Sequence, residues 1–214
     1  MHISSPSPLN ETPTPPDQAT PMPKTTRLDY FDALPGGLLI WIVFLVEMGT
    51  FALFFLVFAW LSRAEPEVFA SSQALLHPDL GTLNTLILLS GSWLAARAVL
   101  ASRKGTSISP WLLGTGLSGL VFLGIKLLEY SQIFAQGIRL STNAFWFNYL
   151  FLTLLHNLHV IAGIYFLFYL AWHLRRGPLS SENRRRLEAA ALYWHLVDVI
   201  WVLLFPLIYF SRNW

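Results

Sequence analysis

Five long apolar runs dominate the chain after a polar, proline-rich first segment. They lie near residues 35–61, 81–101, 110–134, 143–174 and 189–210. Each run is long enough for a helix that crosses the hydrocarbon core, which takes about 20 residues. Residues 1–30 instead hold seven prolines among Ser, Thr and Asn, a composition typical of disordered segments. We therefore predict an all-α, polytopic membrane protein, with a disordered tail over 1–30 and a bundle of five transmembrane helices over 31–214.

The composition supports a membrane protein and removes several kinds of site. Charged residues make up only 12% of the chain, against about 25% in soluble domains, and the mean hydropathy is +0.51. The absence of cysteine excludes disulfides, a thiolate nucleophile, iron–sulfur clusters and covalently attached haem. A net charge of +2 gives no sign of a nucleic-acid partner, and we expect none.

The Lys and Arg residues outside the apolar runs indicate the orientation. Ten lie in the N-terminal tail, the second loop and the fourth loop, and three lie on the opposite side. The positive-inside rule therefore predicts a cytoplasmic N-terminus and an external C-terminus. The short basic loop Arg175–Glu188 is expected to fix this topology and to contact lipid headgroups.

The last apolar run contains two ionisable residues, His195 and Asp198, flanked by Trp194 and Trp201. Residues three apart share one helix face, and an ionisable group in a bilayer costs about 2.5–3.5 kcal/mol on insertion scales. We therefore predict that His195 and Asp198 are structural partners that face neighbouring helices rather than lipid. The two tryptophans, seven residues apart, are expected to pack on the same surroundings.

An isolated acid, Glu47, lies near the middle of the first run. Intramembrane acids are either partnered across helices or engaged in function. The residues leave both readings open: a neutral acid hydrogen-bonded to a neighbouring helix, or an acid that exchanges protons or faces a ligand. We predict a protonated Glu47 that is accessible from a lipid-filled cleft.

The third and fourth runs each carry an i, i+3 pair. Lys126 and Glu129 are expected to form a structural ion pair, because pairing lowers the cost of burying both charges. His156 and His159 have a spacing that suits a metal or an axial haem ligand. Matching carboxylates are missing on the neighbouring runs, so we predict helix–helix hydrogen bonds and no metal site.

One short motif suggests a different class of protein. Ser118 lies in a Gly-x-Ser-Gly segment similar to that of rhomboid proteases, with His195 as a possible base. Small residues crowd this whole run, which is the usual sign of close helix packing. A free-standing redox or hydrolytic membrane enzyme, using His156, His159, His195 or Ser118, remains the alternative. A transporter is disfavoured because no internal repeat is visible.

Five groups of residues, one on each predicted span, form an ordered series. They are Glu47 with Phe51, Phe54 and Phe55; Leu83, Asn84 and Thr85; Gly124, Lys126, Glu129 and Tyr130; Thr153, His156, His159, Val160 and Gly163; and Tyr193, Trp194, His195, Val197, Asp198 and Trp201. In order and spacing, this series resembles the motifs of cytochrome c oxidase subunit III and its shorter relatives. Two positions depart from it, since Val46 stands where a serine is common and Leu154 where glycine is usual.

The resemblance implies a function as well as a fold. Five-span forms include quinol-oxidase subunit III and the NorE group linked to bacterial nitric oxide reductase, and the small size and short loops look most like NorE. It implies a subunit with no catalytic residues and no redox cofactor, seated beside the catalytic haem–copper subunit of an oxidase or a nitric oxide reductase. It also implies a V-shaped helix arrangement with phospholipid in the cleft, in a bacterial inner membrane, and a role in respiratory electron transport or denitrification.

Overall fold

The computed structural model describes residues 34–174 and 179–210, and every element in these ranges is a helix. The long helices are α2 (Leu38–Ala64), α4 (Pro78–Arg103), α5 (Ser109–Ala135), α6 (Ala144–His173) and α7 (Ser181–Phe210), with a short helix, α3 (Pro66–Gln73), between the first two. All five long helices are apolar enough, and long enough, to cross a membrane. The predicted all-α architecture with five spans is confirmed. The tail over residues 1–30 lies outside the described residues.

The helix boundaries follow local signals in the chain. Pro78 and Pro110 stand in the first turns of α4 and α5, where the missing N–H of proline costs no hydrogen bond. Asn143 caps α6, because its side-chain oxygen accepts the backbone N–H of Trp146 at 2.9 Å. The short helix α3 was not predicted from the sequence. It is held by Phe69, which contacts Phe58 of α2 edge to face.

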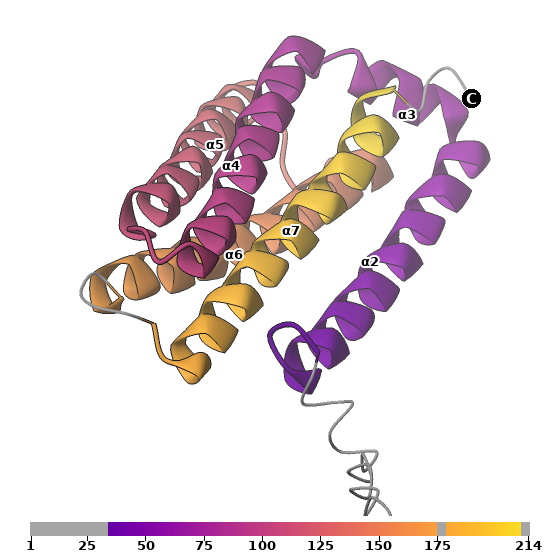
Figure 1. Ribbon diagram of the computed structural model, residues 1–214. Helices are drawn as coiled ribbons and strands as arrows, with labels where there is room; N and C mark the ends of the chain where they lie inside the picture. Colours follow the sequence, from indigo (N-terminus) through magenta and orange to yellow (C-terminus); the bar gives the residue numbers. More distant parts are fainter. Residues whose placement is uncertain (1–33, 175–178, 211–214) are drawn as a thin grey trace, which may run out of the picture.

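Helices α4 to α7 form the main bundle, and α2 lies at its edge (Figure 1). α5 packs between α4 and α6, and α7 packs against α4 and α6, while α2 contacts mainly α7 and α6. Two residues of α2, Phe51 and Phe58, are buried. The outward face of α2 is instead rich in exposed Leu, Ile, Val and Trp. Such a surface is suited to lipid tails or to another membrane protein.

The centre of the bundle is filled by large aromatic side chains. Trp194 lies across α5 and α6, and a Cβ added at Gly119 or Gly163 would approach its ring to 2.6 or 3.0 Å. Trp201 is fully buried; its indole Nε1–H donates to Thr85 Oγ1 at 3.0 Å. The predicted packing role of both tryptophans and of Gly163 is confirmed: glycine is needed where the indole ring touches the neighbouring backbone.

Candidate functional site

The most deeply buried charges form a cluster between α5, α6 and α7. Lys126 Nζ lies 2.7 Å from Glu129 Oε2, and the two side chains are 0% and 2% exposed. Nζ also lies 3.1 Å from the Tyr149 hydroxyl and 3.3 Å from the Tyr209 hydroxyl. The Tyr209 hydroxyl donates to Glu129 Oε1 at 2.5 Å. The predicted ion pair is confirmed, and the tyrosines supply the polar partners that a buried pair needs.

A second set of hydrogen bonds extends the cluster along α6. The Tyr130 hydroxyl donates to Thr153 Oγ1 at 2.8 Å and accepts from Asn157 Nδ2 at 3.1 Å. Thr153 in turn donates to the backbone oxygen of Tyr149 at 2.6 Å. The two bonds of Tyr130 tie α5 to α6 beside the ion pair. Tyr149 was not predicted from the sequence, although its spacing from Thr153 and His156 places all three on neighbouring turns of one face.

The acid of the first span is paired with a histidine of the fourth. Glu47 Oε2 lies 3.2 Å from His159 Nε2, with the side chains 26% and 18% exposed. His159 Nδ1 lies 2.8 Å from the Leu155 backbone oxygen and donates its N–H there, so that Nε2 faces the carboxyl group. His159 thus reaches another helix as predicted, through an ion-pair contact with Glu47, and this pair is a polar contact that holds α2 to the bundle.

His156 behaves differently from His159. Neither of its ring nitrogens has a hydrogen-bond partner among the described residues. Its ring stacks on Trp201, with 5.2 Å between centroids, and meets the edge of Phe122 at 5.6 Å. The predicted hydrogen-bonding role is therefore wrong for His156, because aromatic side chains of α5 and α7 enclose it and no polar group reaches it.

The two histidines consequently do not act as a pair of ligands. His156 faces α5 and α7, whereas His159 faces α2. Within residues 34–174 and 179–210, no group of three His, Asp or Glu side chains converges in a way that could hold a metal ion.

The His195–Asp198 pair of the last span is also separated. His195 Nδ1 lies 2.5 Å from Ser92 Oγ of α4. Asp198 is 3% exposed; neither of its carboxyl oxygens meets the geometric limits of a hydrogen bond to a described residue, but the Ser92 hydroxyl lies close enough to interact with it. The expected orientation toward neighbouring helices is confirmed for Asp198. The expected direct partnership is wrong, because the side chain of Ser92, which the sequence did not single out, contacts both residues and bonds to the imidazole.

The protease alternative loses its geometric basis. The Ser118 hydroxyl donates to the backbone oxygen of Thr115 at 2.7 Å, while His195 bonds to Ser92. A nucleophile and its base must share a hydrogen bond before a dyad can operate. Ser118 instead packs against α4, since a Cβ at Gly91 would lie 2.0 Å from its oxygen. The Gly-x-Ser-Gly segment is a close helix contact.

Comparison with known proteins points to the same family as the ordered series of motifs. Residues 37–213 match the family described as Cytochrome c oxidase subunit III. The chain is 34% identical over 178 residues to a "Cytochrome c oxidase subunit 3" of Thermostichus vulcanus, which covers 81% of this chain and 85% of the relative. It is 29% identical over 157 residues to the "Cytochrome bo(3) ubiquinol oxidase subunit 3" of Pseudomonas aeruginosa, with 66% and 75% covered. It is 26% identical over 171 residues to a "Probable quinol oxidase subunit 3" of Staphylococcus saprophyticus, with 79% and 85% covered. The family match extends over all five spans, and the chain therefore belongs to the cytochrome c oxidase subunit III family.

Proposed function

We propose that this chain is a non-redox accessory subunit, seated beside the catalytic haem–copper subunit of a respiratory oxidase in a bacterial inner membrane. The observation that carries the proposal is that residues of the family motifs contact other helices of the same chain. Lys126, Glu129 and His159 each bind another helix of the same chain. Such residues hold a bundle together, as expected of a structural subunit. The match to subunit III over residues 37–213 supports the same reading.

The outer surface supports a role in assembly. α2 has two buried residues, and its exposed face carries Leu39, Leu45, Leu56 and Trp60, each at least two-thirds exposed. In a membrane, helices associate through close packing and polar contacts rather than through exclusion of water. An apolar face of this size is available to lipid or to a neighbouring transmembrane subunit.

The partner we favour reduces oxygen. The relatives compared above carry the names of cytochrome c oxidase and quinol oxidase subunits. The second candidate is a nitric oxide reductase, as for the NorE group, and it is supported by the five spans and short loops of this chain.

We also propose that a phospholipid occupies the groove between α2, α6 and α7. This groove encloses about 290 Å³ and is lined almost entirely by apolar side chains, among them Ile40, Phe166 and Tyr193. Arg186 stands at the end where α7 begins, a suitable position for a lipid phosphate. An acyl chain in the groove would run toward the Glu47–His159 pair.

Purification of the tagged chain from its native membranes in a mild detergent tests the main proposal. We expect a haem–copper catalytic subunit to co-purify, seen as a haem absorbance band and identified by mass spectrometry. Cells grown with oxygen and cells grown with nitrate should be compared, since the growth condition that yields the complex separates an oxidase from a nitric oxide reductase. An equally tagged, unrelated five-span protein is the control. A haem band that stays with the isolated chain would contradict the proposal and favour a free-standing haem enzyme.

A further inference from the structure

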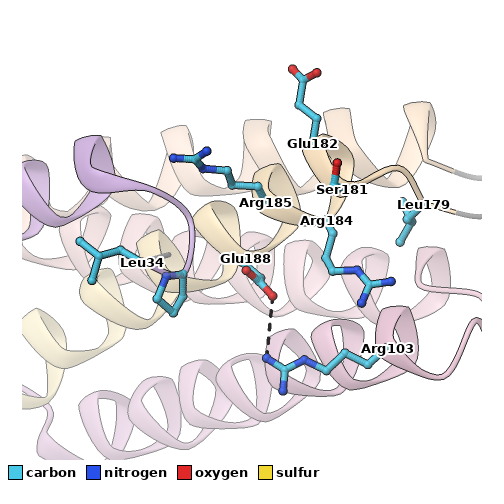
Figure 2. A pocket seen from close by; sticks show the side chains of 9 residues that line it. Leu34, Arg103, Leu179, Ser181, Glu182, Arg184, Arg185 and Glu188 are labelled. Atoms are coloured by element: carbon cyan, nitrogen blue, oxygen red, sulfur yellow. Dashed lines mark ion pairs between the residues drawn. The ribbon is translucent and has the colours of Figure 1, made fainter. Parts of the chain in front are cut away.

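A polar pocket of about 810 Å³ lies where three helix ends meet, on the predicted cytoplasmic side (Figure 2). It is bounded by the residues before α2, by the end of α4 and by the first turns of α7. Its lining combines both signs of charge with apolar side chains: Leu34, Pro35, Arg103, Leu179, Ser181, Glu182, Arg184, Arg185 and Glu188. The family motifs described above contribute none of these residues.

Two arginines of this pocket offer donors for a phosphate group. Arg184 extends from α7 toward Arg103 at the end of α4 (Figure 2). Arg184 has no ion pair among the described residues, and Arg103 has only a long one, with 3.8 Å between its Nη2 and Glu188 Oε1. The planar guanidinium group presents paired N–H donors that match the oxygens of a phosphate. Arginines on two different helices can therefore bind one phosphate from two sides.

One carboxylate makes the pocket unsuitable for a simple anion. Glu188 is 20% exposed and lies in the pocket beside the arginines (Figure 2). At 3.8 Å its contact with Arg103 is longer than a hydrogen bond, so it can still accept N–H donors. The other acid, Glu182, points away from Glu188 and pairs with Arg186 at 2.5 Å. A ligand that carries a phosphate and an ammonium group would satisfy Arg184, Arg103 and Glu188 together.

The position of the pocket indicates a lipid rather than a soluble molecule. The pocket opens at the ends of membrane-spanning helices, the depth at which headgroups lie. Its apolar walls, Leu34, Pro35 and Leu179, are suited to a glycerol backbone. The apolar groove proposed above for a phospholipid uses Arg186, Ala189, Ala190 and Tyr193 of α7, and these project from another face of the helix than Arg184 and Glu188. The two sites are separate.

We propose that this pocket binds the phosphoethanolamine headgroup of a membrane phospholipid, with the phosphate on Arg103 and Arg184 and the ammonium group on Glu188. Phosphatidylcholine carries the same phosphate, but its methylated ammonium has no N–H to donate to Glu188. Phosphatidylglycerol carries the phosphate and no cation. The pocket should therefore prefer phosphatidylethanolamine to both.

Native mass spectrometry of the delipidated protein, titrated with each of the three lipids in detergent, tests this preference. We expect phosphatidylethanolamine to bind about tenfold more tightly than phosphatidylcholine, the value of one charge-assisted hydrogen bond. Glu188→Gln should abolish the difference while leaving phosphatidylcholine binding unchanged. Arg184→Gln should weaken binding of all three lipids. Arg139→Gln, the same change at an exposed arginine on the opposite side of the membrane, is the matched control and should keep the preference.

Several results would overturn the proposal. Equal binding of the three lipids, or tighter binding of phosphatidylglycerol, would contradict a zwitterionic headgroup site. Retention of the preference in Glu188→Gln, or unchanged affinity for all three lipids in Arg184→Gln, would place the lipid elsewhere. Full competition by water-soluble phosphoethanolamine at equimolar concentration would show a soluble ligand instead of a lipid.

Each variant is first compared with the parent chain by size-exclusion chromatography, and Arg184→Lys replaces Arg184→Gln if the latter aggregates. The lysine keeps the charge without the paired donors, so unchanged binding in it would contradict the bidentate contact.

Discussion

Two ionic contacts inside the membrane differ in almost every physical respect. The Lys126–Glu129 pair joins neighbouring turns of α5 and is enclosed by α6 and α7, with both side chains at most 2% exposed. The Glu47–His159 pair joins α2 to α6 and leaves each side chain about one-fifth to one-quarter exposed. Both belong to the series of motifs shared with subunit III. One therefore lies in the core of the bundle and the other at its edge.

The surroundings of the two pairs explain why loss of the core pair should destabilise the fold more than loss of the edge pair. Lys126 and Glu129 receive extra hydrogen bonds from Tyr149 and Tyr209, so loss of either charge leaves several partners unsatisfied. His159 keeps its bond to the Leu155 backbone whether or not Glu47 is present. Loss of the core pair should therefore reduce the yield of folded protein. Loss of the edge pair should change only the contact of α2 with the bundle and with the surrounding lipid. The predictions below test that difference in order of expected effect.

The largest effect is expected from Lys126→Met. The substitution leaves the Glu129 carboxylate buried without its cation, and breaking a buried pair in this way costs about 3–5 kcal/mol. We expect a steep loss of folded, monodisperse protein and a lower melting temperature. The double variant Lys126→Met/Glu129→Gln should recover part of the loss, because no unpaired charge remains. Arg139→Met, which removes an exposed cation, is the control. A double variant no better than the single one would contradict a charge-pair origin.

A smaller effect is expected from filling the contact between α5 and Trp194. A Cβ at Gly119 would lie 2.6 Å from the indole and 2.8 Å from Ile164, so Gly119→Ala should overpack the core and cost about 1–3 kcal/mol. Gly124 lies on the same helix with nothing within 4 Å of its added Cβ. Gly124→Ala should therefore be neutral or slightly stabilising, since alanine favours a helix by about 1 kcal/mol over glycine. Thermal melts of both variants in one detergent measure the contrast, and equal melting temperatures would count against tight packing at Gly119.

The two ionisable residues of α7 should respond unequally. Ser92→Ala removes the partner of His195, at a cost of about 1 kcal/mol for a half-buried imidazole. Asp198→Leu removes a buried carboxyl group whose polar contact is the Ser92 hydroxyl, and Ser92 keeps its bond to His195, so the yield of folded protein should change little. Expression level and melting temperature measure both effects. A severe loss in Asp198→Leu with a mild one in Ser92→Ala would restore the direct His195–Asp198 partnership expected from the sequence.

The architecture could be predicted from the sequence because it depends on length and composition. Five apolar runs gave five helices, with ends displaced from the predicted ones by up to eight residues. The largest displacement lies at the start of α7. It arises because the first two turns of this helix are polar and basic and carry no hydrophobic signal. The short helix α3 was not predicted for a similar reason, since its eight residues mix polar and apolar side chains without a clear periodicity.

The site was predicted only where partners lie on one helix. Lys126 and Glu129 are three residues apart, so their pairing follows from helix geometry. Spacing gave the wrong answer for His195 and Asp198, because Ser92 on α4 competes for the imidazole. The pairing of Glu47 with His159 joins residues 112 positions apart, and nothing local encodes it. Contacts between helices depend on how each helix is rotated in the bundle, which the hydrophobic pattern does not fix when most faces are apolar.

The smallest structural effect is expected at Glu47, where chemical labelling is a more sensitive measure than stability. We predict that Glu47 is reached from the lipid side, because a quarter of its side chain is exposed. A hydrophobic carbodiimide, which modifies neutral carboxylic acids in hydrocarbon, should then label Glu47 in membranes. It should spare Glu129, which is enclosed and paired with Lys126. Mass spectrometry of the labelled peptides measures both, and Glu47→Gln should lose the label while it keeps its contact with His159 and the yield of folded protein. If Glu47 resists labelling at acidic as well as neutral pH, or if Glu47→Gln fails to fold, the edge pair is a charged structural contact of the same kind as the core pair, and the contrast between them disappears.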